Sequence, residues 1–518
     1  MHSKMSKIVA FVMALFSFAF IFAEEEIPEE KVFTIIDSFH EYNLNPQLAN
    51  YSSDAQILTG LYEGLFSYDP QTLEPVPAII ESYKISRNKL RWSFVIRENA
   101  KFSNGEFITS SHVKDSWLKL LNPKMQAPFA SLFDCIQGAK EYRTGEGKAE
   151  DVGIFIQSEK QFSVLLKTPA EHLDSILCHH SFSVVHSDSN VYSGAFVLES
   201  YENNVLTLKK NTEYYDAENV PSEIIKVIQS DDVKENAYLF NIGKVDWVIS
   251  QIDINSVIDY KSIFITPEFA TEYMFFKCDR FPWDREDFRN ALLTAVPWGK
   301  LRSQAIVPAE CFIYSLSNYK SPVGITETDS ALAKAMLDTA KKTAGMAENK
   351  NPEIILAIAD NDYMKAQAEI LRTAWEAIGV KVKISKTPVE RYLDSISGWK
   401  ADIFSYTWIG DFADPLAFLE LFRSDSSLNE SSWVNPAYDS LLEKASQKTG
   451  AERMEILSGA EDVLLSDGVV LPISHPVTLN VLDKKAVIGW YVNALDIHPL
   501  KYLSKKKVDV YVPNLVMR

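Results

Sequence analysis

Cysteine is scarce in this sequence, which has four in 518 residues: Cys135, Cys178, Cys278 and Cys311. No two of them have the C-x-x-C spacing of a zinc or redox site. Cys278 and Cys311 are the closest pair in the chain, but spacing alone does not say which cysteines pair. Both possibilities stay open, a disulfide in an exported protein or four buried free thiols.

The signatures of common enzyme classes are also missing. The chain has no G-x-S-x-G elbow, no H-E-x-x-H, no Walker loop and no glycine-rich dinucleotide fingerprint. The run Cys178-His179-His180 is a poor metal site, because neighbouring residues of a helix point about 100° apart. Asp411 and Asp414 leave one alternative open, the acid pair of a secreted hydrolase. We expect no enzymatic activity, no metal and no cofactor.

Blocks of basic residues are absent as well. The formal net charge is −18, and no Lys/Arg cluster with interleaved aromatic residues occurs. Such an acidic surface repels the phosphate backbone of nucleic acids. We therefore expect no nucleic acid among the partners of this protein.

Only one apolar run is long enough to suggest targeting. Lys4 and Lys7 precede residues 8–23, which are apolar and stop at Glu24. A basic start, an apolar middle and the small Ala23 are typical of a signal peptide over residues 1–23. An N-terminal membrane anchor is the alternative, although the run is shorter than a span requires. No Cys stands at the expected cleavage point, so we predict a soluble periplasmic or extracytoplasmic protein with a charge of about −20.

The length and the strand pattern indicate a chain of several α/β lobes. A chain of 518 residues with 46% hydrophobic residues exceeds one ordinary core. Residues 354–358 and 380–384 read as strands around a helix at 365–378 that Gly379 ends, a pattern that predicts parallel pairing. Ligands of such sheets bind beyond the carboxyl ends of the strands. Elsewhere, Asn203-Asn204 predicts a type I′ hairpin turn.

The stretch 401–420, ADIFSYTWIGDFADPLAFLE, is the candidate working surface. It begins as an apolar strand and must turn before Pro415, which neither continues a ladder nor donates a hydrogen bond. The turn holds Trp408, Gly410 and Asp411, a flat ring and a carboxylate beside a residue that allows close backbone approach. This set suits a cationic or amine-bearing ligand. The structural alternative is that Asp411 caps the turn and Trp408 belongs to the core.

Several ordered motifs carry a family resemblance. They include W-x-G-D-F-x-D-P at 408–415, LYEGLFSYD at 61–69, KFSNGEFITSSHV at 101–113 and NPAYD at 435–439. In order and spacing the chain resembles the extracytoplasmic oligopeptide-binding proteins of ABC importers, solute-binding protein family 5. The resemblance covers nearly all of the chain after the signal peptide.

The resemblance implies an α/β, periplasmic binding protein-like fold with two α/β lobes, a hinge, and an extra smaller domain in the N-terminal half. The expected boundaries place lobe I at 24–62, 191–277 and 486–518, domain II at 63–190, and lobe III at 278–485. By the same resemblance, the Asp411 carboxylate receives the α-ammonium of a peptide, and Trp408 and Phe129 form walls of side-chain pockets. The full set of expected ligand-binding residues is Asn50, Ser52, Phe129, Trp408, Ile409, Gly410 and Asp411.

The function implied is capture of short peptides by closure of two lobes and delivery to an ABC permease in the cytoplasmic membrane. We expect a monomer. The alternatives that stay open are the same fold binding a nickel complex, haem or an oligosaccharide, and a chaperone-like secreted protein. Peptide length and recognition of the peptide carboxylate also stay open, since no basic residue is an obvious partner.

Overall fold

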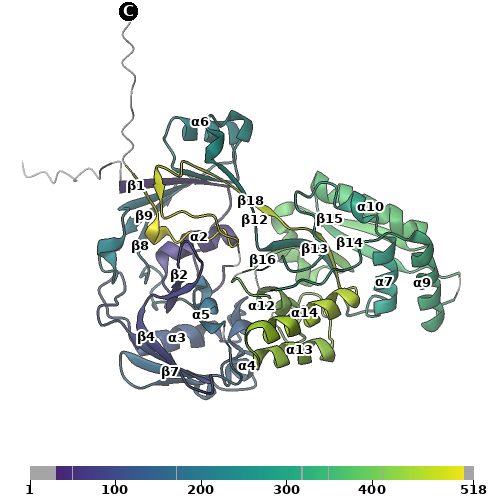
Figure 1. Cartoon of the computed structure of the whole chain (residues 1–518), viewed down its shortest axis with the longest axis horizontal. Coiled ribbons are helices and arrows are strands. Elements are labelled where there is room, and N and C mark those ends of the chain that lie inside the picture. Colours follow the sequence, from purple (N-terminus) through teal and green to yellow (C-terminus); the bar gives the residue numbers. More distant parts are fainter. Residues whose placement is uncertain are drawn as a thin grey trace, which may run out of the picture.

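The computed structural model describes residues 28, 31–49, 51–170, 172–314, 316, 319–347, 349–410, 412–426 and 428–506, with the backbone alone at Ser52, Glu390, Asp394 and Ser397. The expected signal peptide at residues 1–23 and the expected site residues Asn50 and Asp411 lie outside these ranges. We use the names lobe I, domain II and lobe III for the parts built on a seven-stranded, a four-stranded and a five-stranded sheet (Figure 1).

Lobe I is a mixed sheet between two helices. Its strands, in spatial order, are β12 (Ile263–Pro267), β18 (Val477–Leu482), β11 (Trp247–Ile249), β1 (Val32–Asp37), β10 (Ile224–Gln229), β9 (Val205–Lys210) and β8 (Phe196–Glu202). Successive side chains of a strand point to opposite faces. Ile35 therefore packs with α2 (Ser52–Leu61), and Ile36 packs with α6 (Val233–Asn241). The first strand thus supports both layers.

Domain II is inserted between α2 and β8. Its antiparallel sheet contains β4 (Ile80–Ile85), β5 (Arg91–Ile96), β7 (Gln161–Leu165) and β6 (Ile154–Ile156), with a small pair β2 (Phe66–Tyr68) and β3 (Pro75–Pro77) beside it. The helices are α3 (Ser110–Leu120), α4 (Ala139–Arg143) and α5 (Leu173–Ile176). Trp92, Phe94 and Ile96 alternate along β5 and are all buried, as half-buried strands require.

Lobe III has helices on both faces of its sheet. The strand order is β15 (Lys381–Thr387), β14 (Glu353–Ala359), β16 (Ile403–Ile409), β13 (Ala270–Phe276) and β17 (Val470–Ser474). The helices are α7 (Glu286–Ala295), α8 (Trp298–Leu301), α9 (Ser330–Thr343), α10 (Asp362–Ala377), α11 (Tyr392–Ser395), α12 (Leu416–Leu419), α13 (Pro436–Ser446) and α14 (Gly450–Ser466). Met274 and Phe276 pack with α7 and α10, whereas Tyr273 and Phe275 face α12 and α13. The parallel pairing of β14 with β15 confirms the predicted crossover.

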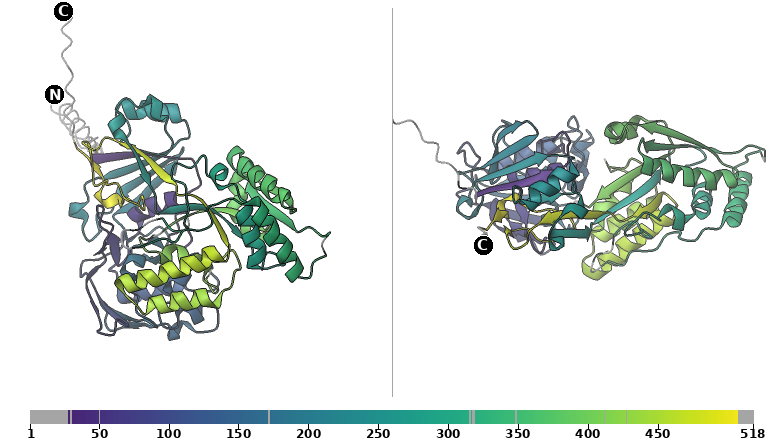
Figure 2. Two further views of the ribbon diagram at one scale, coloured as in Figure 1. Left: turned by 45° about the vertical axis from the view of Figure 1, so that its right-hand side comes forward. Right: turned by 90° about the horizontal axis from the view of Figure 1, so that it is seen from above.

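Two strands cross from one lobe to the other. β12 continues into β13 through Glu268 and Phe269, and β17 continues into β18 through His475 and Pro476. The two crossings lie side by side, because the Glu268 N–H donates to the Pro476 carbonyl at 3.0 Å. Viewed from above in Figure 2, lobes I and III lie next to each other.

The expected boundaries at 277 and 485 differ from this pairing. β13 pairs with β16 and β17 of lobe III, and β18 pairs with β11 and β12 of lobe I. Both segments are apolar strands on either side of the crossing, and only a short step, Pro267-Glu268 in one and His475-Pro476 in the other, separates the two sheets. The C-terminal part of the described chain returns to lobe I as β19 (Val487–Ile488) and β20 (Ser504–Lys505).

The four cysteines are free thiols in the described structure. In the same part of the chain, no helix combines the length and the apolar character that a membrane span needs.

Candidate functional site

A cavity of about 360 Å³ lies where lobe I, domain II and lobe III meet. Lobe I contributes residues of β1 and α2, domain II contributes Phe129, His179 and His180, and lobe III contributes residues 406–410. The end of β16 therefore reaches a cavity whose other walls come from other parts of the fold. This is the position in which sheet topology places a ligand.

The lobe III wall is built from aromatic rings and a close backbone contact. Trp408 stacks on Tyr406 at 6.3 Å between ring centroids, and its indole N–H donates to the Ala417 carbonyl at 2.7 Å. The Gly410 N–H donates to the Phe269 carbonyl at 2.7 Å. These bonds fix the orientation of the strand end at the cavity.

Gly410 is required by the packing. A Cβ atom on Gly410 would lie 2.3 Å from Cδ1 of the buried Phe269 ring. We predict that Gly410→Ala lowers the free energy of unfolding by about 1–3 kcal/mol, because the ring has to move in a filled core. Gly459→Ala is the matched control, since Gly459 lies inside α14 with open space around it and alanine favours a helix. Urea denaturation should show that Gly410→Ala lowers the free energy of unfolding and that Gly459→Ala raises it. Equal changes in the two variants would contradict the packing argument.

The domain II wall carries Phe129 and two histidines. Phe129 is buried and lies 4.6 Å from the His179 ring and 6.3 Å from the Trp408 ring, between centroids. Burial lowers the pKa of His180 well below its usual value, with neighbouring His179 adding to the shift. The His180 ring is therefore neutral, and its Nδ1 lies 2.8 Å from the Pro46 carbonyl oxygen. No group of three or more metal-ligating side chains occurs among the described residues.

The lobe I wall is the start of α2 and the end of β1. The Gln56 amide exchanges two hydrogen bonds with the backbone of His498, at 2.5 Å and 3.0 Å. Asp37 accepts from the Ser38 N–H at 2.8 Å and from the Tyr42 hydroxyl at 3.1 Å. Burial raises the pKa of Asp37 despite these bonds.

The cavity is acidic. Asp37, Glu268 and Asp496 line it, and none of the described lining residues is Lys or Arg. Burial and the charge of nearby Asp496 raise the pKa of Glu268 to about 8. A ligand that fills this cavity therefore meets acidic side chains and aromatic rings but no described Lys or Arg, a lining that favours a positively charged group over an anion.

The structure brings four of the seven expected site residues to one cavity, namely Phe129, Trp408, Ile409 and Gly410. Asn50 and Asp411 lie outside the described residues, but their neighbours Tyr51 and Gly410 line the cavity. Ser52 is described only as the first residue of α2. Whether these residues contact a ligand stays a prediction.

Glu268 and Asp496 were not among the expected site residues. One signal was available for Glu268: it and Glu272 are the only acids in the apolar run 262–276. Asp496 lies 228 positions further along the chain, so no local pattern connects the two.

Asp414 does not form a catalytic pair. It accepts two hydrogen bonds from the Arg453 guanidinium, at 2.6 Å and 2.9 Å, and one from the Leu416 N–H at 3.0 Å. Burial opposes ionisation, but the charge and hydrogen bonds of Arg453 keep the pKa of Asp414 below its usual value. A carboxylate that Arg453 holds ionised near neutral pH, with both oxygens hydrogen-bonded, is unsuited to proton transfer.

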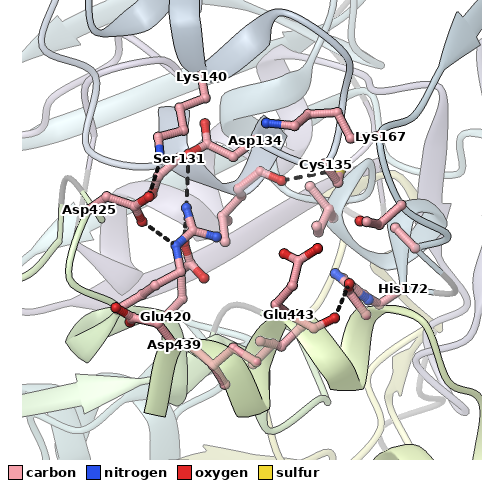
Figure 3. Close-up of a pocket in the computed structure, with 18 of the residues that line it drawn as sticks. Ser131, Asp134, Cys135, Lys140, Lys167, His172, Glu420, Asp425, Asp439 and Glu443 are labelled. Atoms are coloured by element: carbon pink, nitrogen blue, oxygen red, sulfur yellow. Dashed lines mark hydrogen bonds and ion pairs between the residues drawn. The ribbon is translucent and has the colours of Figure 1, made fainter. Parts of the chain in front are cut away.

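A second cavity, of about 440 Å³, lies between domain II and the α12–α13 side of lobe III (Figure 3). Several of its charged groups form ion pairs between the two parts. Arg423 of lobe III bonds Asp134 of domain II at 2.8 Å, Asp134 also pairs with Arg143, and Lys140 pairs with Asp425. This network explains how domain II is held against lobe III, and it makes the acidic cavity the better candidate for ligand binding.

Known proteins resemble this chain over nearly its whole length. It is 24% identical over 506 residues to the dipeptide-binding protein DppE of Bacillus subtilis, covering 93% of this chain and 92% of DppE. It is 25% identical over 520 residues to YgiS of Escherichia coli, named a probable deoxycholate-binding periplasmic protein, covering 94% of this chain and 95% of YgiS.

The fold is that of a solved binding protein. The structure of the murein tripeptide binding protein MppA of Escherichia coli superposes with a TM-score of 0.80 at 22% identity, covering 93% of this chain and 99% of MppA. Residues 74–430 match the family model described as bacterial extracellular solute-binding proteins, family 5 Middle. Because this model matches more than half of the 518 residues, the chain belongs to family 5 of the bacterial extracellular solute-binding proteins.

Proposed function

We propose that this protein captures short peptides outside the cytoplasmic membrane and delivers them, as a soluble monomer, to an ABC permease. The peptide occupies the cavity between the lobes, and the Asp411 carboxylate binds its α-ammonium. The protein binds its solute without chemical conversion.

The observation that carries this proposal is an open strand edge on the cavity wall. β14 pairs with β16 only at Ile403 and Phe404, so no described strand lies beside the β14-facing edge along residues 407–409. On its other side the same segment is fully paired with β13. An extended peptide can add to such an edge through backbone hydrogen bonds, which tolerate varied side chains.

The chemistry at the end of that edge suits a peptide amino terminus. Asp411 directly follows Gly410, which lines the cavity. The cavity contains acids and no described Lys or Arg, so it favours an ammonium over a carboxylate. A charge-assisted hydrogen bond from the ammonium to Asp411 contributes about 1.5–3 kcal/mol.

The hinge for closure is provided by the two crossings, 267–270 and 474–477. Only a few extended residues connect the two sheets there, which is the usual construction of a hinge between lobes. Phe129 and Trp408 come from different parts of the fold and approach each other over the cavity. Closure about this hinge would shield the bound peptide from water.

The alternative is a non-peptide solute, because the relative YgiS is named a probable deoxycholate-binding protein. Deoxycholate is an anion, and the acidic cavity of this protein disfavours anions. Fold alone does not decide the ligand.

Identifying what the protein carries tests the proposal. We expect mass spectrometry of the natively purified, then denatured protein to release short peptides, and defined tri- to pentapeptides to stabilise the ligand-free protein. At a hundredfold excess over Kd the gain in unfolding free energy is about 2.7 kcal/mol. Absence of stabilisation by any peptide mixture, or co-purification of a nickel complex, haem or oligosaccharide, would contradict the proposal.

A further inference from the structure

The Glu268 carboxylate is buried without a protein partner. Only 8% of the residue is exposed, it lines the cavity, and no described residue donates a hydrogen bond to it or forms an ion pair with it. Glu272 lies four residues further along the same segment and is equally buried. Unlike Glu268, it accepts hydrogen bonds from the Tyr363 and Ser474 hydroxyls, at 2.8 Å and 2.7 Å. A buried acid left unpaired is costly, so its retention at a cavity points to a ligand.

A second carboxylate lies near it. Asp496 uses one oxygen, Oδ1, which accepts from the Asn480 amide at 2.9 Å and lies 3.1 Å from Nε2 of His498. Its other oxygen has no hydrogen bond within the described part of the chain. The repulsion between Asp496 and an ionised Glu268 adds to the cost of burial and helps to keep the pKa of Glu268 high, at about 8.

The number of acids exceeds what one α-ammonium can neutralise. Asp37 is satisfied by the Ser38 N–H and the Tyr42 hydroxyl. Glu268 accepts no side-chain hydrogen bond from a described residue, and Asp496 has one oxygen, Oδ2, without such a bond. No described Lys or Arg lines the cavity. If Asp411 binds the amino terminus of the peptide, these two carboxylates remain open to another positive charge.

We propose that Glu268 and Asp496 form a subsite for the side-chain cation of a lysine or arginine residue in the bound peptide. The inference rests on the proposed peptide-binding function and makes it specific: the preferred ligands are short basic peptides. Bringing an ammonium or guanidinium group between the two carboxylates removes their repulsion and gives the buried Glu268 and the half-buried Asp496 a partner.

Lysine and norleucine peptides test this subsite, because the two side chains have the same methylene chain and differ in the ammonium. Tripeptides with lysine or norleucine at each position in turn are titrated calorimetrically into the full-length mature protein. At one position we expect the lysine peptide to bind about tenfold to a hundredfold more tightly at pH 8.5. Glu268→Gln is expected to bring that ratio close to one.

Two further variants make the comparison specific. Asp496→Asn should also reduce the lysine preference, while its amide oxygen can still accept from Asn480. Glu202→Gln removes a charge from an exposed residue of β8 outside the cavity and should leave the preference unchanged. Urea denaturation of each ligand-free variant shows whether it is folded, and Glu268→Gln should not be less stable than wild type at pH 8.5, since it removes an unpaired buried acid.

The lysine preference should also depend on pH. Below pH 8 Glu268 is mostly protonated and must release its proton to bind a cation, so the lysine-to-norleucine ratio should rise between pH 6 and pH 9. The other titratable groups of the described cavity lining are Asp37, Tyr51, Tyr68, Cys178, His179, His180, Tyr406 and Asp496, and His498 lies 3.1 Å from Asp496. The rise must therefore disappear in Glu268→Gln if Glu268 is its source.

The results distinguish a failure of the proposed subsite from a failure of the proposed peptide-binding function. Equal binding of lysine and norleucine peptides by wild type, or a lysine preference that survives in Glu268→Gln, would overturn the subsite while leaving peptide binding intact. Failure of every peptide to bind would instead overturn the proposed function and the subsite with it. If acetylation of the peptide amino terminus abolished the effect of Glu268→Gln, Glu268 would bind the α-ammonium, and the subsite would also be wrong.

Discussion

Replacing Arg453 by methionine is expected to lower the free energy of unfolding by about 3–5 kcal/mol at pH 7, because it leaves the Asp414 carboxylate buried without its cation. Both side chains are nearly inaccessible, with 4% of Arg453 and 11% of Asp414 exposed, and they form two hydrogen bonds. Asp414 also accepts from the N–H of Leu416, the first residue of α12, which follows the candidate site in the chain. Urea denaturation of the ligand-free protein measures the change.

The sign of the pH dependence follows from the lowered pKa of Asp414. A carboxylate whose pKa is lowered by folding stabilises the protein above its unfolded pKa, and this stabilisation is lost as the pH falls. The cost of Arg453→Met should therefore shrink in acid, where Asp414 can be protonated. The double variant Asp414→Asn/Arg453→Met is the control, and it should be more stable than Arg453→Met at pH 7. A single variant as stable as wild type, or a double variant no better than the single one, would contradict the account.

Asp411→Asn is expected to weaken peptide binding about tenfold to a hundredfold, which corresponds to the loss of one charge-assisted hydrogen bond. Asparagine keeps the size of the side chain and its ability to accept a hydrogen bond, so the change isolates the charge. Titration calorimetry with the tightest-binding free tripeptide measures the effect. Glu202→Gln, which removes an exposed charge in β8, should bind the same peptide as wild type does. Equal affinities for Asp411→Asn and wild type would contradict the role of Asp411.

Local structure was predictable from the sequence where the pattern is local. The predicted helix 365–378 is observed at Asp362–Ala377, and Gly379 follows it with a φ of +101°. The predicted hairpin turn is confirmed by the positive φ values of Asn203 and Asn204, at 51° and 62°. In each case neighbouring residues carry the information: the apolar period of a helix, or the left-handed backbone that asparagine tolerates.

The arrangement of the lobes was less predictable, because it depends on contacts between distant segments. β18 joins lobe I by pairing with β12, more than two hundred residues earlier in the chain. Within the stretch 470–482, His475-Pro476 separates two apolar strands, but the pattern does not say that the strands belong to different sheets. The expected boundaries at 277 and 485 therefore lie further along the chain than the crossings at 267–270 and 474–477.

The residues of the candidate site were likewise predictable only where a short motif contains them. Phe129, Trp408, Ile409 and Gly410 were expected from short motifs, and all four line one cavity. The acidic character of the cavity comes from Asp37, Glu268 and Asp496, which three separate segments bring together. An acid in an apolar strand pattern indicates that some group must satisfy it. Only the folded structure shows that no side chain in the described part of the chain does so for Glu268.

The central claim is that Asp411 binds the α-ammonium of a peptide in the acidic cavity, and acetylating the peptide tests it most directly. Calorimetry compares one tripeptide with a free and with an acetylated amino terminus, against wild type and Asp411→Asn. The account predicts that acetylation weakens binding to wild type at least about tenfold and changes binding to Asp411→Asn little, a coupling that a direct contact produces. If acetylation has the same effect on both proteins, or none on wild type, Asp411 does not hold the amino terminus and the account is wrong.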